Sequence, residues 1–286
     1  MSSFFILLQR VLPQHLLSRL FGLFAECRVS WLKNFLIRRF IKAYGVNMQE
    51  AVLGSADDFD NFNHFFTRAL KPGLRPLPAN ESTVVSPADG AISALGQIGD
   101  DSIFQAKGKS FSLTALLGGN TALAQHFRNG SFATVYLAPK DYHRVHMPLG
   151  GTLQEMIYVP GKLFSVNQVT AENIDSLFAR NERAVCVFST ERGPMAVVLV
   201  GAMIVAGIET VWAGQVAPAD GGISSVDYAQ QEPSIHLNRG EELGRFKLGS
   251  TAILLFGPGM MQWHKEFQSG SVLRMGQALG ELTTRS

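Results

Sequence analysis

The sequence contains few charged residues, only two cysteines and no recognisable nucleotide-binding motif. Charged residues make up 17% of the 286 and apolar residues 46%, which is apolar for a soluble protein but short of a protein with many membrane spans. Cys27 and Cys186 stand alone, so neither a CxxC metal site nor a disulfide framework is available, and a reducing compartment fits this pattern. Because no GxGxxG follows a strand-like run and no GxxxxGK(S/T) occurs, the common nucleotide-binding α/β folds are excluded.

A long uninterrupted apolar stretch is also absent from residues 1–45, although Leu and Phe are abundant there. Arg10, Pro13, Arg19 and Glu26 interrupt this segment before about 20 apolar residues accumulate, the length that a transmembrane helix requires. No basic region precedes the apolar run and no A-x-A-like site closes it, so a secretory signal is not predicted.

The same N-terminal segment is strongly basic. It holds seven Arg and Lys residues and one Glu, a formal charge of +6, so the rest of the chain carries −4 of the overall +2. Apolar residues at helical spacing between these cations indicate short amphipathic helices that lie in an anionic bilayer surface. Packing on the rest of the chain or on a second copy would give the same pattern, so a homodimer stays open. Leu and Phe outnumber the basic residues, which argues against a nucleic acid as partner.

Beyond residue 45 the pattern changes to short β-rich runs separated by Gly and Pro. The runs cover residues 83–85, 132–137, 151–159, 184–189, 195–208, 211–216 and 251–256, with helical pieces near 58–70 and 113–117. Many short strands with turn signals favour an antiparallel barrel or sandwich. The sequence therefore predicts an α+β protein, in which residues 46–286 form an antiparallel β-rich barrel or sandwich core and residues 1–45 form amphipathic helices.

Three places carry side chains that can do chemistry, and each is weak alone. Asp89 lies in an SPADG turn, where Asp-Gly is ordinary turn chemistry. His143 and His146 lie three residues apart in KDYHRVHMP, a run dense in proton carriers but without a complete ligand set, so no metal site is expected. Gly249 and Ser250 open an apolar strand, a pattern that usually marks a turn or bulge.

Taken together, the three places supply the members of a nucleophile triad, in the chain order Asp89, His146, Ser250. The serine lacks the GxSxG elbow of an α/β-hydrolase. Gly249 precedes it instead, and a residue without a Cβ allows a strained, exposed peptide whose carbonyl can be attacked. This arrangement suits a serine whose target is its own upstream peptide bond.

The sequence resembles the bacterial-type phosphatidylserine decarboxylases, which are pyruvoyl-dependent and cleave themselves. The resemblance rests on an ordered set of motifs with similar spacing that spans nearly the whole chain. The motifs are FFTR at 65–68, KPGLRP at 71–76, SPADG at 86–90, DYHRVH at 141–146, LFSVN at 163–167, NER at 181–183, GEELG at 240–244 and LGST at 248–251.

This resemblance implies that the chain is a zymogen. Asp89 would orient His146, which deprotonates Ser250, and the serine oxygen then attacks the carbonyl of Gly249 to form an ester. Elimination and hydrolysis would leave a pyruvoyl group at residue 250, on a small alpha chain of residues 250–286 beside a large beta chain of residues 1–249. The cofactor is then built in, and no separate cofactor is expected.

The resemblance also implies the reaction and its place. The pyruvoyl group made from Ser250 would form a Schiff base with phosphatidylserine and take up the electrons released as carbon dioxide leaves. His143 is the candidate proton donor that completes phosphatidylethanolamine, a step of phospholipid biosynthesis. We expect a peripheral protein on the cytoplasmic side of the cell (inner) membrane.

Three other functions use the same residues differently. A pyruvoyl decarboxylase of a soluble amino acid would share Ser250 but would not need the basic apolar segment. A membrane-attached Ser-His-Asp hydrolase would keep Ser250 as a serine in an uncut chain. A small β-barrel carrier would leave the proton carriers idle.

Overall fold

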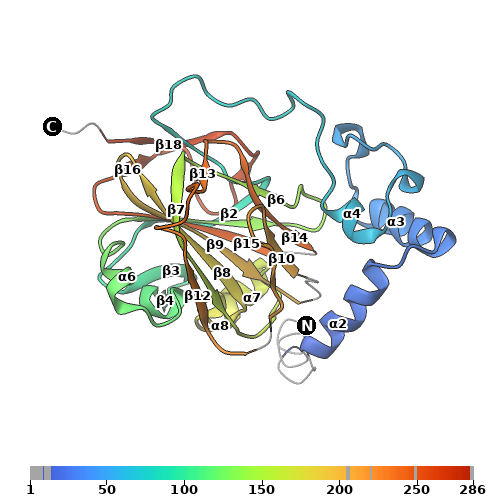
Figure 1. The fold of residues 1–286 in the computed structure, drawn as a ribbon, viewed down its shortest axis with the longest axis horizontal. Helices are drawn as coiled ribbons and strands as arrows, with labels where there is room; N and C mark the ends of the chain where they lie inside the picture. The colour runs from blue at the N-terminus through green and yellow to red at the C-terminus, as the bar shows by residue number, and fades with distance from the viewer. Residues whose placement is uncertain (1–8, 10–13, 204–206, 220, 248–249, 284–286) are drawn as a thin grey trace.

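A nine-stranded antiparallel sheet runs through the centre of the protein (Figure 1). The computed structural model describes residues 9, 14–203, 207–219, 221–247 and 250–283. The central strands are β8, β9, β15 and β5, so β15 is hydrogen-bonded on both sides. In order, the sheet contains β12 (Ser224–Asp227), β7 (Gly151–Val159), β8 (Arg183–Thr190), β9 (Gly193–Gly201), β15 (Ser250–Phe256), β5 (Ser131–Leu137), β2 (Gly90–Gln97) and β17 (Val272–Leu273), and β13 (His236–Leu237) also pairs with β7.

A four-stranded sheet covers one face of the large sheet. Its order is β11 (Gly214–Ala217), β10 (Gly207–Thr210), β14 (Glu242–Lys247) and β6 (Arg144–His146). Side chains alternate between the two faces of a strand, and Ala252 and Leu254 of β15 point toward this second sheet. There they join a buried cluster with Val145 of β6 and Phe246 of β14, so the two sheets pack as a sandwich.

Short helices and a hairpin cover the opposite face. Ile253 and Leu255 of β15 pack there with Leu116 and Phe178 in a second buried cluster. The covering elements are β3 (Ser102–Ala106), β4 (Lys109–Ser112), α5 (Leu113–Leu116), α6 (Thr121–Gln125), α7 (Gln168–Asn173) and α8 (Leu177–Arg180). A third sheet, β1 (Thr83–Val85), β18 (Ala278–Leu282) and β16 (Met261–Trp263), completes the body.

Helices from the N-terminal part lie at one side of the body (Figure 1). They are α2 (Gln14–Ala25), α3 (Ser30–Tyr44) and α4 (Phe62–Phe66), with the 3-10 turns η1 (Met48–Glu50) and η2 (Ala56–Asp58). The inner face of α3, at Ile37, is buried with Phe65 and Phe66 of α4, whereas Trp31 and Phe35 on its outer face stay largely exposed. No helix in the described part of the chain is long and apolar enough to cross a membrane. The domain boundary at residue 45 stays a prediction.

The predicted fold class is confirmed as α+β with antiparallel sheets. The sandwich alternative holds, because the described strands form open sheets rather than a closed barrel. One predicted strand, residues 195–208, was wrong, since the chain leaves the large sheet after Gly201 and enters the second sheet with β10. An apolar run with high β propensity does not reveal which sheet each half joins.

Candidate active site

Ser250 is the first residue of β15, as the sequence predicts. It pairs with Leu137 of β5 on one side and Gly201 of β9 on the other. The side chain is fully buried, and its Oγ has no hydrogen-bond partner among the described residues. The bond expected to be cut joins Ser250 to Gly249, which lies outside the described residues. A buried hydroxyl with no partner is costly to keep, and a catalytic role is one explanation for such a group.

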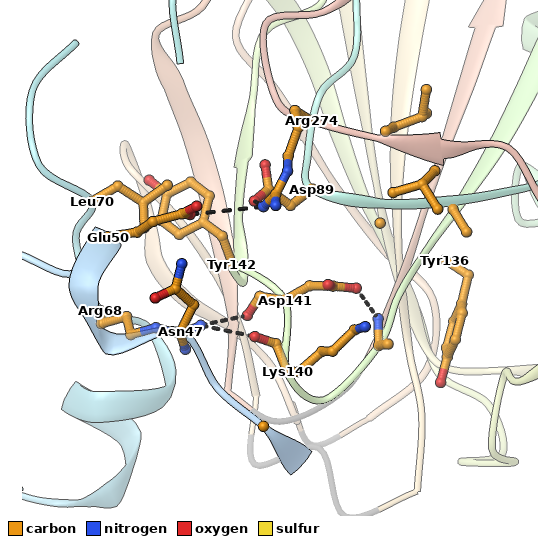
Figure 2. Close-up of a pocket in the computed structure, with 16 residues that line it drawn as sticks. Asn47, Glu50, Arg68, Leu70, Asp89, Tyr136, Lys140, Asp141, Tyr142 and Arg274 are labelled. Atoms are coloured by element: carbon orange, nitrogen blue, oxygen red, sulfur yellow. Dashed lines mark hydrogen bonds and ion pairs between the residues drawn. The ribbon is translucent and has the colours of Figure 1, made fainter. Parts of the chain in front are cut away.

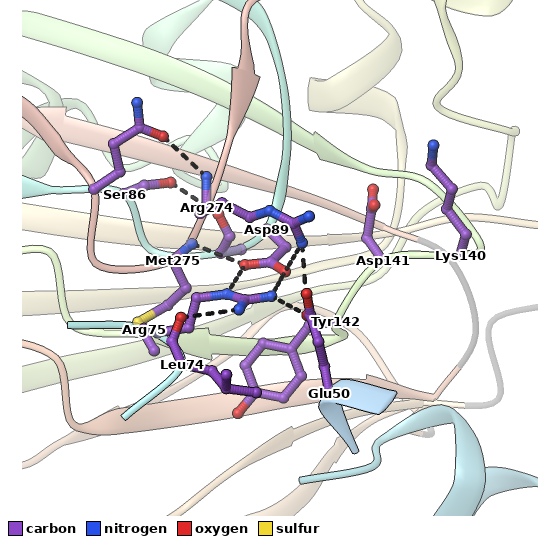
Figure 3. Close-up of polar contacts among 12 residues, drawn as sticks. Glu50, Leu74, Arg75, Ser86, Asp89, Lys140, Asp141, Tyr142, Arg274 and Met275 are labelled. Atoms are coloured by element: carbon purple, nitrogen blue, oxygen red, sulfur yellow. Dashed lines mark hydrogen bonds and ion pairs between the residues drawn. The ribbon is translucent and has the colours of Figure 1, made fainter. Parts of the chain in front are cut away.

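Asp89 lies in the turn that leads into β2, and its carboxylate is buried beneath two arginines (Figure 3). It accepts hydrogen bonds from Nε of Arg75 at 2.9 Å, from Nη1 of Arg274 at 3.1 Å and from the backbone N–H of Met275 at 2.8 Å. Burial would raise the pKa of Asp89, but these donors outweigh it and hold the pKa below its ordinary value. Asp89 is therefore a charged carboxylate that is already fully engaged.

His146, at the end of β6, is held by one hydrogen bond at each ring nitrogen. Nδ1 lies 2.9 Å from the carbonyl oxygen of Gly240, which can only accept, so Nδ1 carries the proton. Nε2 then holds the lone pair and accepts the hydroxyl of Tyr142, 3.0 Å away. Burial lowers the pKa of His146 and raises that of Tyr142 to about 12, so a neutral imidazole accepts from a protonated phenol.

The structure does not join the predicted triad. Among the described residues, no hydrogen bond links any two of Asp89, His146 and Ser250. The group that orients the imidazole of His146 here is the carbonyl of Gly240. The charge of Asp89 still favours protonation of His146, although burial has the larger effect on its pKa. The roles of the three residues stay predictions.

His143 is fully buried next to the strand that pairs with Ser250. Its Nε2 donates to the carbonyl oxygen of Ala138 at 3.0 Å, and Ala138 directly follows Leu137, the register partner of Ser250. Its ring stacks on Phe66 with 4.0 Å between centroids, and its Nδ1 has no partner. Burial lowers the pKa of His143 to about 3, so Nδ1 is a free lone pair at neutral pH. Before it can donate a proton, His143 must first accept one.

A cavity of about 410 Å³ opens beside these residues (Figure 2). Of the catalytic candidates, Asp89 is the one among the described residues that line it. His143 and His146 contact the wall residues Ala138 and Tyr142, and Ser250 pairs with Leu137, between the wall residues Tyr136 and Ala138. The cavity therefore borders Asp89 directly and lies one residue away from the other three candidates.

Sequence reasoning left three polar residues of this region without a role. Arg68 and Arg274 line the cavity, and Arg75 lies behind Asp89. Arg68 and Arg75 belong to the FFTR and KPGLRP motifs, so the motifs were visible but their chemistry was not. In the part of the chain that the structure covers, no group of three or more His, Cys, Asp or Glu side chains could hold a metal ion.

The paired carboxylate of Asp89 lines the cavity, and behind its wall lie two neutral imidazoles and a buried hydroxyl that has no partner among the described residues. These groups can take up, hold and pass protons, which defines a catalytic site on a β-sandwich protein. A family model described as phosphatidylserine decarboxylase matches residues 62–281, and the chain belongs to that family. A second family model, described as PSD, matches residues 4–45.

Curated relatives are similar over almost their full length. A phosphatidylserine decarboxylase proenzyme from Pseudomonas fluorescens strain Pf-5 is 62% identical over 278 residues, which is 96% of each chain. The proenzyme from Ectopseudomonas mendocina strain ymp is 62% identical over 277 residues, 96% of this chain and 97% of the relative. That from Pseudomonas putida strain F1 is 61% identical over 280 residues, 97% of each chain.

Proposed function

We propose that this chain is a proenzyme that cleaves itself before Ser250 and then converts phosphatidylserine to phosphatidylethanolamine and carbon dioxide. The family to which the chain belongs makes it a phosphatidylserine decarboxylase, and its relatives carry the name proenzyme. The observation that carries the proposal is the fully buried, unpartnered Oγ of Ser250 at the first position of a central strand.

The residues around position 250 fit a pyruvoyl group. Among the described residues, the Oγ that must react has no hydrogen-bond partner. Strands β5 and β9 pair with both sides of β15, so they would hold the new chain end in place after the cut. When present, a pyruvoyl group supplies a carbonyl that takes up the electrons released with carbon dioxide. The protein's part is to position the substrate and to move protons.

The two histidines suit different proton transfers. Self-cleavage requires a base for the hydroxyl of Ser250, and we assign Nε2 of His146, whose Nδ1–H the carbonyl of Gly240 already fixes. Decarboxylation requires a proton at the carbon that loses carbon dioxide, and we assign that delivery to His143. Its unpartnered Nδ1 supports this role, because that nitrogen is free to take up a proton and pass it on.

We also propose that the protein works at the membrane, on the cytoplasmic side of the inner membrane. The substrate lies in a bilayer, and the outer face of the N-terminal helices is apolar and cationic. Leu23, Phe24, Trp31 and Phe35 are all more than half exposed. The surface pocket next to α3 adds Arg38, Arg39 and Lys42. Apolar burial and attraction to anionic lipid would act together.

Denaturing mass spectrometry tests the proposal most directly. The purified protein is expected as two pieces, residues 1–249 and 250–286, the smaller one blocked to N-terminal sequencing. Ser250→Ala is expected to stay whole and to release no phosphatidylethanolamine from phosphatidylserine vesicles. Thr134→Val is the matched control, because Thr134 of the neighbouring β5 also buries a hydroxyl without a partner.

The same spectrum separates the alternatives. An uncut wild-type chain that still hydrolyses esters would show a Ser-His-Asp hydrolase. A cut chain that acts on free amino acids but not on phosphatidylserine would show a soluble-substrate decarboxylase. Normal cleavage in Ser250→Ala would remove the assignment of the bond.

A further inference from the structure

Arg68 is a buried cation with unused hydrogen-bond donors. It follows α4, and only 3% of its surface is exposed. Its Nη2 donates to the backbone carbonyls of Lys140 at 3.0 Å and Asp141 at 3.1 Å (Figure 2). Within the described residues, its Nε and Nη1 have no hydrogen-bond partner and no carboxylate forms an ion pair with it. The other buried arginine of this region, Arg75, uses all its nitrogens on Asp89, Glu50 and the carbonyl of Leu74.

A guanidinium with unused N–H donors can bind an anion. The carboxylates of Asp141, Asp89 and Glu50 lie close enough to attract Arg68, but none of them contacts it. A buried cation that no carboxylate contacts is unfavourable, and a ligand can complete it. Arg68 lines the cavity, its guanidinium lies 5.6 Å from the ring centroid of Phe65, and the two backbone carbonyls fix its orientation. The free N–H groups of a fixed guanidinium suit the two oxygens of a phosphate or a carboxylate.

We propose that Arg68 binds the phosphodiester of the phosphatidylserine headgroup and thereby selects a glycerophospholipid over free serine. This inference rests on the proposed function. One backbone segment contacts both the reactive residue and the cation. Leu137 pairs with Ser250, and the carbonyls of Lys140 and Asp141, a few residues further on, accept hydrogen bonds from Arg68. An extended chain of this length spans at most about 14 Å, so one short segment of backbone contacts both the cation at the cavity wall and the reactive residue behind it.

The substrate offers two anions, and the chemistry favours the phosphodiester. The carboxylate loses its charge as it becomes carbon dioxide, so a buried cation on it would stabilise the substrate more than the transition state and slow the reaction. The phosphodiester keeps its charge from substrate to product. A cation bound there contributes affinity and position without opposing the bond cleavage.

The test compares two substrates on cleaved protein. One is a short-chain phosphatidylserine in detergent micelles, and the other is the same lipid with its phosphodiester methylated to a neutral triester. The wild type should prefer the charged diester by about 10- to 100-fold in kcat/KM, the range for hydrogen bonds to a charged group. In Arg68→Gln, kcat/KM should fall for the diester and stay unchanged for the triester, so that the preference disappears. Arg68→Lys should keep part of the preference.

The control is Arg128→Gln, because Arg128 also buries an Nε without a partner but lies away from the cavity. It should keep the full preference. Rates are expressed per cleaved molecule, measured from the small chain on a denaturing gel, so slower self-cleavage does not enter the comparison.

Two outcomes would overturn the inference. A wild type that is cut and active but accepts both lipids equally has no phosphodiester subsite, whatever the variants do. An Arg68→Gln protein that loses the same factor on both lipids uses Arg68 for the carboxylate or for structural support. Failure of the proposed function looks different, since the wild type would then be uncut or would make no phosphatidylethanolamine.

Discussion

The hydroxyl of Tyr142 lies 3.0 Å from Nε2 of His146, and it occupies the lone pair that self-cleavage needs. The opposite nitrogen donates to the carbonyl of Gly240 at 2.9 Å, so the imidazole is fully engaged while Ser250 is not. If His146 is the base for self-cleavage, as we propose, it can accept the proton of Ser250 only after the phenol has moved off Nε2 and the two residues have come into contact.

This relationship predicts that Tyr142→Phe speeds self-cleavage. A neutral buried hydrogen bond contributes about 0.5–1.5 kcal/mol, so its loss should raise the rate by about 2- to 10-fold. The measurement is the fraction of small chain over time after the uncut precursor is made by cell-free synthesis. The control is Tyr228→Phe, which removes the phenol of a partly buried tyrosine that packs against the core between the sheets. It should leave the rate unchanged. A slower rate in Tyr142→Phe would show that the phenol passes the proton on instead of blocking it.

The two histidines should separate the two reactions. His146→Ala should remain uncut, because no other group is assigned to take the proton of Ser250. His143→Ala should still cut but should lose about 10²–10⁴ in turnover on phosphatidylserine, the usual range for one lost proton-transfer group. The readouts are the cleaved fraction on a denaturing gel and the turnover per cleaved molecule. Full turnover per cleaved molecule in His143→Ala would remove it from the catalytic residues.

Asp89 should contribute stability that is independent of catalysis. In an uncut Ser250→Ala background, Asp89→Asn leaves the buried guanidinium of Arg75 without its main partner. Breaking a buried ion pair from one side costs about 3–5 kcal/mol in free energy of unfolding, measured here by urea titration. The control Asp57→Asn, which removes an exposed pair with Arg38, should change little. Equal stability of both variants would contradict the structural role of Asp89.

In mature protein the same carboxylate would connect the two chains. Asp89 belongs to residues 1–249, whereas its partners Arg274 and Met275 belong to residues 250–286. Loss of Asp89 should therefore also favour release of the small chain in urea.

Acid should destabilise the folded protein through its buried histidines. The pKa of His143 is lowered to about 3 from an ordinary value of 6.5. At a pH between these values, the histidine is protonated in the unfolded chain and neutral in the folded chain. Stability is then present above pH 6.5 and is lost as the pH falls, by about 1.4 kcal/mol per unit for one histidine. His146 acts in the same direction. Urea titrations between about pH 5 and 6 give the free energy of unfolding as a function of pH. In the uncut background, His143→Leu should make this pH dependence less steep by the equivalent of one proton. An unchanged slope would mean that His143 is protonated in the fold.

The exposed aromatic side chains of α3 should drive membrane binding without affecting self-cleavage. Trp31→Ser with Phe35→Ser should lower partitioning onto anionic vesicles by about tenfold or more, because burying one large apolar side chain contributes about 1.5–3 kcal/mol. Val226→Ser, at an exposed apolar position on β12, is the control. High salt should release only part of the bound wild type, since salt screens charge but not apolar burial. Complete release would show that charge alone holds the protein.

The amino-acid sequence by itself determined the local elements and supplied the candidate reactive groups. Ser250 opens β15 because a run of apolar residues with good β propensity follows it, and residues 30–44 form a helix with apolar residues at helical spacing. Which apolar residues of α3 are buried was not visible in that spacing, since Ile37 is buried while Trp31 and Phe35 are exposed. The ordered motifs identified the family, which the family model and the relatives confirm. The apolar run at 195–208 was misjudged, since β propensity is the same whichever sheet a strand joins.

Only the tertiary structure decided which groups meet. Asp89 bonds to Arg274, 185 residues away, and His146 bonds to Gly240, 94 residues away, contacts that arise where separate segments pack together. The pairing of Nη2 of Arg68, and the absence of a partner for its Nε and Nη1 among the described residues, are likewise properties of the packed cavity wall, because Arg68 and residues 138–141 come from distant parts of the chain. A sequence fixes the donors and acceptors that a chain carries. Hydrogen bonds act only within about 3 Å, so their pairing and their absence depend on how the sheets and loops pack.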